Sequence, residues 1–499
     1  MRDALLILQV SVHVKEPTIP AKNGDVKMNF RKLLATTFLT LLLVWAFTAA
    51  FTGVLLAQTS SSNNNDDDSN PYSNYSGVRI DPNGVLRRDH SLDYGRVNEQ
   101  YLMSARASYS QLPKNVQEKS LIRYISLNRL EKALIDGNGV ITEEMKYLVG
   151  IQRIRYVFYF PESKDIVIAG PAEGWYSGYE GVMMGITSRR PVCELQDLVV
   201  ALRAYAPGKE ATAVVGCSID PTEEGNARLQ QFQQSFGRYD GPGRRAAFVR
   251  GLRESLGMQT VRVDGIPAST HAATVMVAAD YRMKQIGIGV EPVPRGVRID
   301  TFINHAEPSG QNALFRWFFV PDYQSVLLTE DRNGMELIGS GVKLVAEDEV
   351  VTATGERIAQ KGKIDKASKI FSKSFTAEYA KLAQKSLVFA QLRNFIDMLV
   401  CAAHIQQEDF YGKSGWSMEF LGNEEKYAVQ TFNAPSRVEP VVGSVVRRGV
   451  FMAPIGGGVE IEPQAALHSD NAKIEEKGQI TNVRNGIKLE LQPNQWWWD

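Results

Sequence analysis

An uninterrupted apolar run near the start of the chain is its clearest hydrophobic pattern. Residues 33–57 carry no charge over 25 positions and directly follow the basic pair Arg31 and Lys32. A basic stretch followed by an apolar one is the order of a secretory signal. Because about 20 apolar residues also suffice to cross a bilayer, a retained anchor is the alternative to cleavage. In both cases the basic pair before the run and the aspartates at 66–68 after it place the body of the chain outside the cytoplasm.

The segments around this run differ from it in composition. Residues 1–27 mix charges with two prolines, which a signal does not need, so we expect translation to begin at Met28. A long cytoplasmic lead is the alternative for these residues. Residues 28–57 then form the signal peptide or signal anchor, and residues 58–77 form a disordered polar tether because they have too few apolar side chains to bury.

Beyond the tether, alternating β-rich and helical patterns predict a layered body. In residues 78–150, apolar positions at helical spacing predict a helical hairpin over 121–148. In residues 151–300, strands alternate with helices, which predicts an α/β core. The strands are expected at 155–160, 165–169, 185–192, 211–219 and 260–263, and the helices at 195–205, 221–236, 245–256 and 270–283.

The later part of the chain has a different pattern, with short strands and one long helix. Residues 301–465 predict a β-rich part with strands at 315–320, 325–329, 336–340, 342–345 and 350–353, a long helix at 375–404 and strand-like segments over 428–461. Residues 466–499 form a polar C-terminal tail that ends in tryptophans at 496–498, which either bind a ligand by stacking or pack on the body itself. The predicted fold is therefore α/β or α+β, with a mixed sheet and packed helices.

Composition and charge narrow the function classes. Lys and Arg together number 56, as do Asp and Glu, so the chain lacks the positive excess of a nucleic-acid-binding protein. Hydrophobic residues make up 44% and charged residues 22%, which is typical of a soluble folded body with no membrane contact beyond 33–57. The three cysteines are too scattered for a zinc site, and we predict no metal and no cofactor. A disulfide between Cys193 and Cys217 after export is possible on spacing alone.

Six stretches in a fixed order carry a resemblance to a known family. They are AGPAEGW (169–175), GCSIDPTEEG (216–225), ADYRMKQIGIG (279–289), GSGVKLVAEDE (339–349), LRNFIDM (392–398) and PIGGGVEI (454–461). Over roughly 120–465 the chain resembles an uncharacterised domain-of-unknown-function family of exported planctomycete proteins. The resemblance implies an extracytoplasmic setting and one continuous family region. It implies no activity, cofactor or site residue.

A polar stripe on the long helix is the most informative candidate site. Arg393, Asp397, Cys401, His404 and Glu408 follow one another at spacings of four, four, three and four. At about 100° per residue these side chains share one narrow face of a helix whose other faces are apolar. One interpretation is an internal ladder that pairs Arg393 with Asp397 and His404 with Glu408. The other is a cleft in which His404 carries protons or binds metal, Asp397 and Glu408 assist it, and Arg393 holds an anion.

Four further residues are weaker candidates. Asp220 begins a helix-capping sequence, and a catalytic role just after a strand is the alternative. Arg282 and Lys284 lie near a helix C-terminus, where Lys284 can pair with Asp280 and both cations can instead bind an anion. His271 opens a helix and is interpreted as an incidental first-turn residue, with a catalytic role as the alternative.

No familiar enzyme signature is present in the sequence, and this absence shapes the functional prediction. We find no GxSxG, HExxH, phosphate-binding loop or dinucleotide fingerprint in a supporting context. We therefore predict an exported envelope protein with a non-catalytic binding or scaffolding role and an unidentified envelope component as its partner. The alternative is an extracytoplasmic hydrolase with an unfamiliar acid/base site. Convergence of the candidate residues on one open pocket would favour the hydrolase.

Overall fold

The computed structural model describes residues within one unit of the chain, Asn70–Asp499. The described residues are 78–88, 107, 112–178, 182–236, 242–306, 313–351, 357–359, 364–445, 450–452, 455–487, 491–492 and 494–499. The predicted lead (1–27), signal segment (28–57) and tether (58–77) lie outside them, so these predictions stay predictions.

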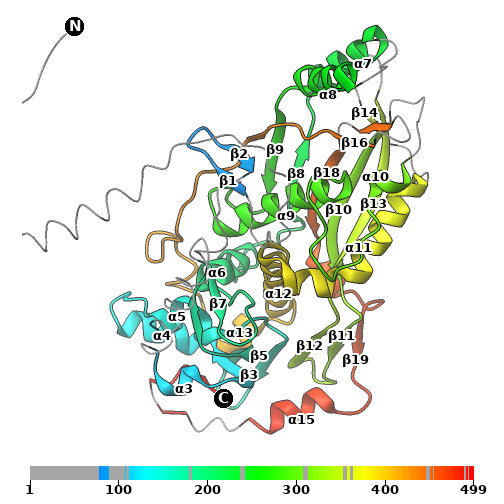
Figure 1. Ribbon diagram of the computed structural model, residues 1–499. Coiled ribbons are helices and arrows are strands. Elements are labelled where there is room, and N and C mark those ends of the chain that lie inside the picture. The colour runs from blue at the N-terminus through cyan, green and yellow to red at the C-terminus, as the bar shows by residue number, and fades with distance from the viewer. Residues whose placement is uncertain are drawn as a thin grey trace, which may run out of the picture. The chain divides into compact units, whose positions relative to one another are not determined.

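A nine-stranded mixed sheet forms one half of the unit (Figure 1). Most neighbours are antiparallel, whereas β10 pairs with β18, and β15 with β2, in parallel. Its strands, in spatial order, are β1 (Val78–Ile80), β2 (Val85–Arg88), β15 (Arg437–Val438), β9 (Gln259–Asp264), β8 (Val215–Asp220), β18 (Ile455–Ile461), β10 (Ala313–Asp322), β13 (Gly341–Val351) and β14 (Arg357–Ala359).

A seven-stranded sheet forms the other half and contains strands from all four predicted segments of the body. Its order is β19 (Ala472–Ile474), β11 (Ser325–Leu328), β12 (Gly334–Ile338), β4 (Tyr156–Phe160), β5 (Asp165–Ala172), β3 (Ser120–Ser126) and β20 (Trp497–Trp498). Two small hairpins, β6 (Trp175–Ser177) with β7 (Met183–Gly185) and β16 (Gly443–Val445) with β17 (Val450–Met452), complete the strands of the described regions. The predicted mixed-sheet fold is confirmed as α+β.

Three long helices build the core between and beside the sheets (Figure 1). Helix α9 packs on β8 and β18, α11 packs on β13, and α12 contacts α6, α9 and α11. Their bounds are α9 (His271–Gly287), α11 (Lys366–Lys385) and α12 (Leu387–Gln407). The other helices are α3 (Lys114–Gln117), α4 (Leu127–Asp136), α5 (Glu143–Lys146), α6 (Leu195–Ala204), α7 (Glu223–Phe236), α8 (Pro242–Leu256), α10 (Phe302–His305), α13 (Phe410–Ser414), α14 (Pro463–Ala466) and α15 (Gln479–Asn485), with the 3₁₀ turn Leu148–Gly150.

Aromatic side chains fill the space between the nine-stranded sheet and these helices. The Trp317 ring on β10 lies 4.6 Å from the ring of Phe371 on α11, measured between centroids. The same tryptophan packs against Gly287, where an added Cβ would lie 2.4 Å from its ring. Any larger residue at this end of α9 would therefore push the helix away from the sheet.

Several element predictions differ from the structure. The helical hairpin at 121–148 is wrong in its first part, because residues 120–126 form β3, and the strand expected at 185–192 is reduced to the end of β7. The strands expected at 342–345 and 350–353 are one strand, β13. The predicted long helix is present as α12, although the expected range 375–404 spans α11 and α12, which meet at Ser386. The polar tail is folded, since Trp498 pairs into the second sheet and stacks on Tyr124 with ring centroids 5.5 Å apart.

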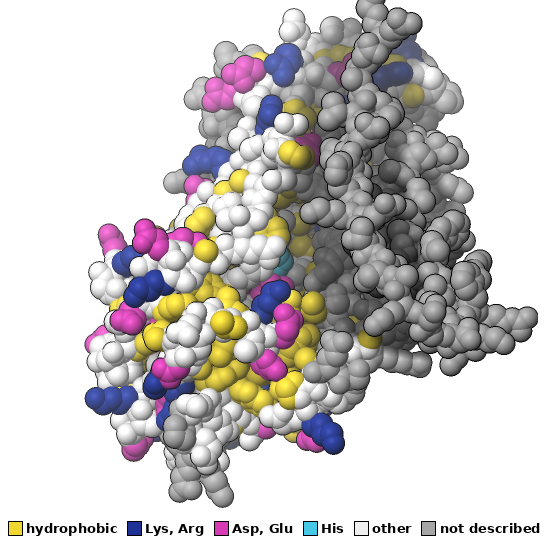
Figure 2. Space-filling model, turned by 90° about the vertical axis from the view of Figure 1, so that its left-hand side faces the viewer, with side chains coloured by type: hydrophobic (Ala, Val, Ile, Leu, Met, Phe, Trp, Pro, Cys, Tyr) yellow, Lys and Arg dark blue, Asp and Glu magenta, His cyan; other side chains and the backbone are white. Residues whose placement is uncertain are grey.

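Apolar side chains are distributed unevenly over the surface and the core. Figure 2 shows them gathered on the lower part of one face. Among the described residues, Ile135, Val140 and Ile141 of the α4–α5 region are exposed. Among the described residues, α12 is the one helix long and apolar enough to cross a membrane, and 94% of that stretch is buried inside the unit. Helix α12 is thus the central core helix of this body.

Candidate functional site

The predicted stripe on α12 is present, but its members have different partners from those expected. Asp397 is fully buried and accepts hydrogen bonds from Arg153 Nε at 2.6 Å and Nη2 at 3.1 Å. Tyr323 Oη donates to the same carboxylate at 2.9 Å. The predicted Arg393–Asp397 pair is wrong, because Arg153, which precedes β4 and is far away in sequence, occupies the aspartate.

Arg393 is left as a buried cation. Its side chain is only 6% exposed, and its Nε has no hydrogen-bond partner among the described residues. Burial, together with the nearby charge of Arg153, lowers the pKa of Arg393 to about 10. It therefore stays protonated at neutral pH, and the carboxylate whose charge acts on it, Asp397, is hydrogen-bonded to Arg153 instead.

His404 and Glu408 also do not form the predicted pair. The His404 ring is buried edge-on against Phe410, and burial with the charges of Arg332 and Lys413 lowers its pKa to about 3. Glu408 instead binds Arg332, with Oε1 and Nη1 2.7 Å apart. A histidine that is neutral and enclosed throughout the physiological range is a poor proton carrier, which argues against the acid/base interpretation.

The two cations proposed to bind anions on α9 already have internal partners. Lys284 Nζ donates to Asp280 Oδ2 at 2.8 Å and to the carbonyl oxygens of Ile219 and Gly457. Burial raises the pKa of Asp280 to about 6, although Lys284 acts in the opposite direction. The expected Lys284–Asp280 pair is confirmed, and it ties α9 to β8 and β18.

Arg282 and Asp220 are likewise engaged. Arg282 forms a buried pair with Glu291, and its Nη1 donates to Ser386 Oγ at the break between α11 and α12. Asp220, at the end of β8, lies 3.4 Å from Arg316 Nη2 on β10. These contacts are structural cross-links between elements, and none of them leaves a charged group aimed at a ligand.

His271 has a more specific setting than its sequence position indicated. Its Nδ1 lies 2.8 Å from Asp197 Oδ2 on α6, and its Nε2 lies 3.4 Å from Gln391 Nε2 on α12. Burial alone would lower its pKa, but the charges of Asp197 and Glu194 raise the pKa of His271 to about 9. An imidazole that is protonated at neutral pH is an ion-pair partner and not a general base.

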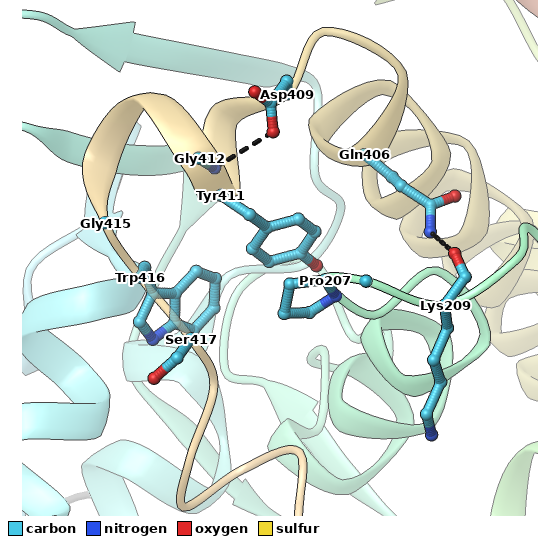
Figure 3. Close-up of a pocket in the computed structure, with 10 residues that line it drawn as sticks. Pro207, Lys209, Gln406, Asp409, Tyr411, Gly412, Gly415, Trp416 and Ser417 are labelled. Carbon is cyan, nitrogen blue, oxygen red and sulfur yellow. Dashed lines mark hydrogen bonds between the residues drawn. The ribbon is translucent and has the colours of Figure 1, made fainter.

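An open pocket lies beside the C-terminal end of α12 and is lined by residues that the stripe does not contain. Its volume is about 480 Å³. Figure 3 shows the Tyr411 ring between Trp416 and the turn that carries Pro207 and Lys209. The full lining is Pro207, Gly208, Lys209, Gln406, Asp409, Tyr411, Gly412, Gly415, Trp416 and Ser417.

The pocket has an aromatic floor and a polar rim. Tyr411 is 4% exposed, and its hydroxyl has no hydrogen-bond partner among the described residues. Trp416 is also buried, with its ring centroid 5.5 Å from that of Tyr411. Asp409, Lys209 and Ser417 are exposed at the edge. Such a surface suits a ligand that has one apolar face and several polar groups.

The backbone that builds this pocket is tightly turned. Asp409 adopts a left-handed conformation with φ 52°, and its Oδ1 accepts a hydrogen bond from Gly412 N at 3.1 Å to cap α13. Gly415 ends that helix at φ 73°. On the opposite side, Gln406 Nε2 donates to the Lys209 carbonyl oxygen at 3.0 Å and holds the 207–209 turn (Figure 3).

Sequence reasoning missed this pocket, although a signal was available. The segment 409–417 places three aromatic residues among glycines, serines and a lysine directly after a long helix. Glycine-rich turns that carry aromatic side chains are typical of binding loops. The partner turn at 207–209, however, lies far away in sequence.

The remaining reactive groups of the described regions are the cysteines and the side chains that can bind metal ions. Cys193, Cys217 and Cys401 are all buried free thiols, so the possible Cys193–Cys217 disulfide does not form. Burial raises the pKa of all three, which makes them unreactive. Within the part of the chain that the structure describes, no group of three or more His, Cys, Asp or Glu residues is placed to hold a metal ion.

Comparison with known families finds a match in the centre of the chain. Residues 217–299 match a family described as protein of unknown function (DUF1598). A DUF1598 domain of unknown function is therefore present, over a shorter span than the predicted 120–465. No curated protein and no solved structure matches the chain.

The DUF1598 domain contains one member of several of the cross-links described above. It covers β8, α7, α8, β9 and α9, and with them Asp220, His271, Arg282 and Lys284. The pocket beside α12 and the Arg393 region lie outside it. Any function of this pocket must therefore be argued from its own geometry.

Proposed function

We propose that the chain is an exported, non-catalytic binding protein that holds a carbohydrate component of the cell envelope in the pocket beside α12. The observation that carries this proposal is the Tyr411 hydroxyl, which is buried at the pocket floor without a partner among the described residues. A buried hydroxyl without a hydrogen bond is unfavourable, and a ligand hydroxyl would satisfy it once a small shift of the floor side chains opens the Tyr411 hydroxyl to the pocket. A sugar also offers an apolar face to the Tyr411 and Trp416 rings and hydroxyls to the rim.

The composition of the pocket supports binding rather than hydrolysis. Asp409 is the single carboxylate among the described lining residues, and one of its oxygens already caps α13. Glycoside hydrolysis ordinarily needs two carboxylates that face each other across the bond. The sequence-based hydrolase candidates His404, Asp397, Glu408 and Asp220 do not line the pocket. The acid/base alternative therefore has no common site there.

The exported setting rests on the basic-then-apolar order at residues 31–57. We expect the mature protein, isolated from cell envelopes, to begin near Gln58. N-terminal peptide mass spectrometry measures this directly. Recovery of an intact 33–57 segment from membranes would make the segment an anchor, and recovery of the protein from the cytoplasm alone would contradict export.

Substitution of Tyr411 by phenylalanine should separate binding from stability. Because the hydroxyl has no partner in the described structure, its removal should leave the thermal midpoint unchanged or raise it, while binding of envelope-derived oligosaccharides falls about tenfold or more. Calorimetric titration of the full chain with a panel of soluble cell-wall oligosaccharides provides the measurement.

Tyr379→Phe is the matched control for this experiment. The Tyr379 hydroxyl is buried outside the pocket and donates to the Phe389 carbonyl oxygen at 2.9 Å. This variant should lose stability by about 1 kcal/mol and keep its oligosaccharide affinity. Equal oligosaccharide binding by wild type and Tyr411→Phe, or binding by neither, would reject the pocket as a carbohydrate site.

A further inference from the structure

A second pocket lies next to the pocket beside α12, and the two have one lining residue in common. The second pocket has a volume of about 300 Å³, and Lys209 lines both. The residue before it, Gly208, lines the pocket beside α12, and the residue after it, Glu210, lines the second pocket. Because Cα atoms two trans peptides apart are separated by at most about 7.6 Å, one ligand of disaccharide size can reach both pockets.

The turn between the two pockets is fixed in position, and its crest is open. Tyr205 Oη donates to the Thr212 carbonyl oxygen at 2.7 Å, and Thr212 Oγ1 donates to the Ala204 carbonyl oxygen at 2.9 Å. At the crest, Gly208 has φ 70°, and a Cβ added there would meet no atom within 4 Å. A ligand can therefore cross the turn without displacing protein atoms.

The second pocket combines an apolar wall with free charges of both signs. Val200, Ile266 and Val429 contribute aliphatic side chains to its lining. Lys209 and Glu210 are exposed at the turn. Within the part of the chain that the structure describes, neither of these two side chains has a hydrogen-bond or ion-pair partner. One ammonium and one carboxylate group are thus available to a ligand.

The other charged residues that line this pocket already have partners. Arg203 forms an ion pair with Glu424. It also donates from Nε to the Leu421 carbonyl oxygen at 2.8 Å and from Nη2 to the Tyr427 carbonyl oxygen at 2.6 Å. These contacts hold the 421–427 segment in place as a wall of the pocket, so this arginine supports the site and is not a free anion receptor.

A short peptide has the groups that this second pocket requires. Its carboxylates suit Lys209, its amino group suits Glu210, and small aliphatic side chains such as that of alanine suit the wall. A neutral sugar offers none of these charges. Since exposed ion pairs contribute only about 0.2–1 kcal/mol each, a free peptide should bind weakly on its own. A peptide that is joined to a sugar already held next door binds at a high effective concentration.

We propose that the two pockets together bind a glycopeptide, with a sugar in the pocket beside α12 and the short peptide that it carries in the second pocket. This inference rests on the proposed carbohydrate function and extends it from the sugar to the attached peptide. Figure 3 shows the Lys209 side chain extending away from the Tyr411 and Trp416 rings, which leaves its ammonium group to the peptide.

Calorimetric titration of the full chain with three matched probes tests this inference. The probes are a disaccharide–tetrapeptide released from bacterial cell wall by a muramidase, the same disaccharide freed from its peptide by an amidase, and the free tetrapeptide. The disaccharide–tetrapeptide should bind at least about tenfold more tightly than the disaccharide, and the free tetrapeptide should bind most weakly.

The three probes separate failure of this inference from failure of the carbohydrate site. Equal affinities for the disaccharide–tetrapeptide and the disaccharide would overturn the inference and leave the carbohydrate site intact. Absence of binding by both would reject the carbohydrate site and the inference with it. A disaccharide–tetrapeptide that binds no more tightly than the free peptide would also reject both, because the sugar would then contribute nothing.

Variants of the second pocket assign the gain in affinity to it. Ile266→Trp narrows this pocket and does not touch the pocket beside α12, so it should reduce the affinity for the disaccharide–tetrapeptide to that for the disaccharide. Ile135→Trp on α4 is the control, because Ile135 is 40% exposed outside both pockets and its replacement should keep the full difference. Full affinity for the disaccharide–tetrapeptide in Ile266→Trp would place the peptide elsewhere and overturn the inference.

A milder variant covers the case in which Ile266→Trp does not fold. Glu210→Gln changes one exposed side chain and should fold, and it should weaken binding of the disaccharide–tetrapeptide about threefold without changing that of the disaccharide. Glu254→Gln on α8 makes the same change at an exposed position outside both pockets and should have no effect. Equal affinities of Glu210→Gln and Glu254→Gln for the disaccharide–tetrapeptide would contradict the assignment.

Discussion

Replacement of Asp397 by alanine should lower the free energy of unfolding by about 3–5 kcal/mol, because it leaves a buried arginine without its carboxylate. Asp397 is fully buried and binds Arg153 through two hydrogen bonds, and it also accepts one from Tyr323. Its removal exposes Arg153 and Arg393 to mutual repulsion in the interior. Urea unfolding followed by circular dichroism measures the loss.

A double-mutant cycle identifies the true partner of Asp397. Arg153→Met alone should also destabilise strongly, and the double variant should lose less than the sum of the two single losses. The exposed pair Lys132 and Asp136 on α4 is the control, and its single variants should change stability by only a few tenths of a kcal/mol. Additive losses for Arg153 and Asp397 would show that the two side chains are not coupled.

The stripe on α12 shows what helical periodicity can predict and what it cannot. The spacing of Arg393, Asp397 and His404 correctly placed these side chains on one face of a buried helix. It could not supply their partners, because Arg153 and Tyr323 lie 244 and 74 positions away from Asp397 in the chain. Local periodicity predicts which residues share a helix face, whereas the tertiary structure determines which neighbours neutralise the charges on that face.

Element type was predictable where the local pattern and the fold agree. The hairpin of β4 and β5 and the helices α6 and α9 follow their sequence patterns closely. Residues 120–126 were misread because β3 continues directly into α4, so apolar positions of a strand and of a helix merge into one apparent helical pattern. Ser386 breaks the long helix with φ −134°, and neither proline nor glycine marks that position.

The C-terminal segment was misjudged for a different reason. Its polar composition indicated a tail, but the Asp499 carboxylate forms an ion pair with Arg123, whose side chain is fully buried. Arg123 also donates to the Val149 carbonyl oxygen at 2.6 Å, and it lies over the Trp497 ring at 5.0 Å. A few such long-range contacts hold a segment that has almost no hydrophobic pattern of its own.

Glu131 on α4 should link the stability of the body to binding in the pocket. This carboxylate is buried and accepts hydrogen bonds from Trp416 Nε1 and from the backbone amides of Phe420 at 2.8 Å and Leu421 at 2.7 Å. Glu131→Ala leaves all three donors unpaired, so the free energy of unfolding should fall by about 3 kcal/mol. The wall of the pocket that carries Trp416 should loosen at the same time, and oligosaccharide binding should be lost.

Glu131→Gln separates these two effects. An amide oxygen can still accept from Phe420 N and Leu421 N, but the amide nitrogen would meet the indole N–H of Trp416, donor against donor. Stability should therefore fall by only about 1–2 kcal/mol, while the affinity for oligosaccharide drops as it does in the alanine variant. Glu419→Ala is the control, because this exposed glutamate lies in the same segment and should change neither quantity. Full binding by a folded Glu131→Gln protein would mean that Trp416 does not contribute to the carbohydrate site, and the pocket would then depend on Tyr411 alone.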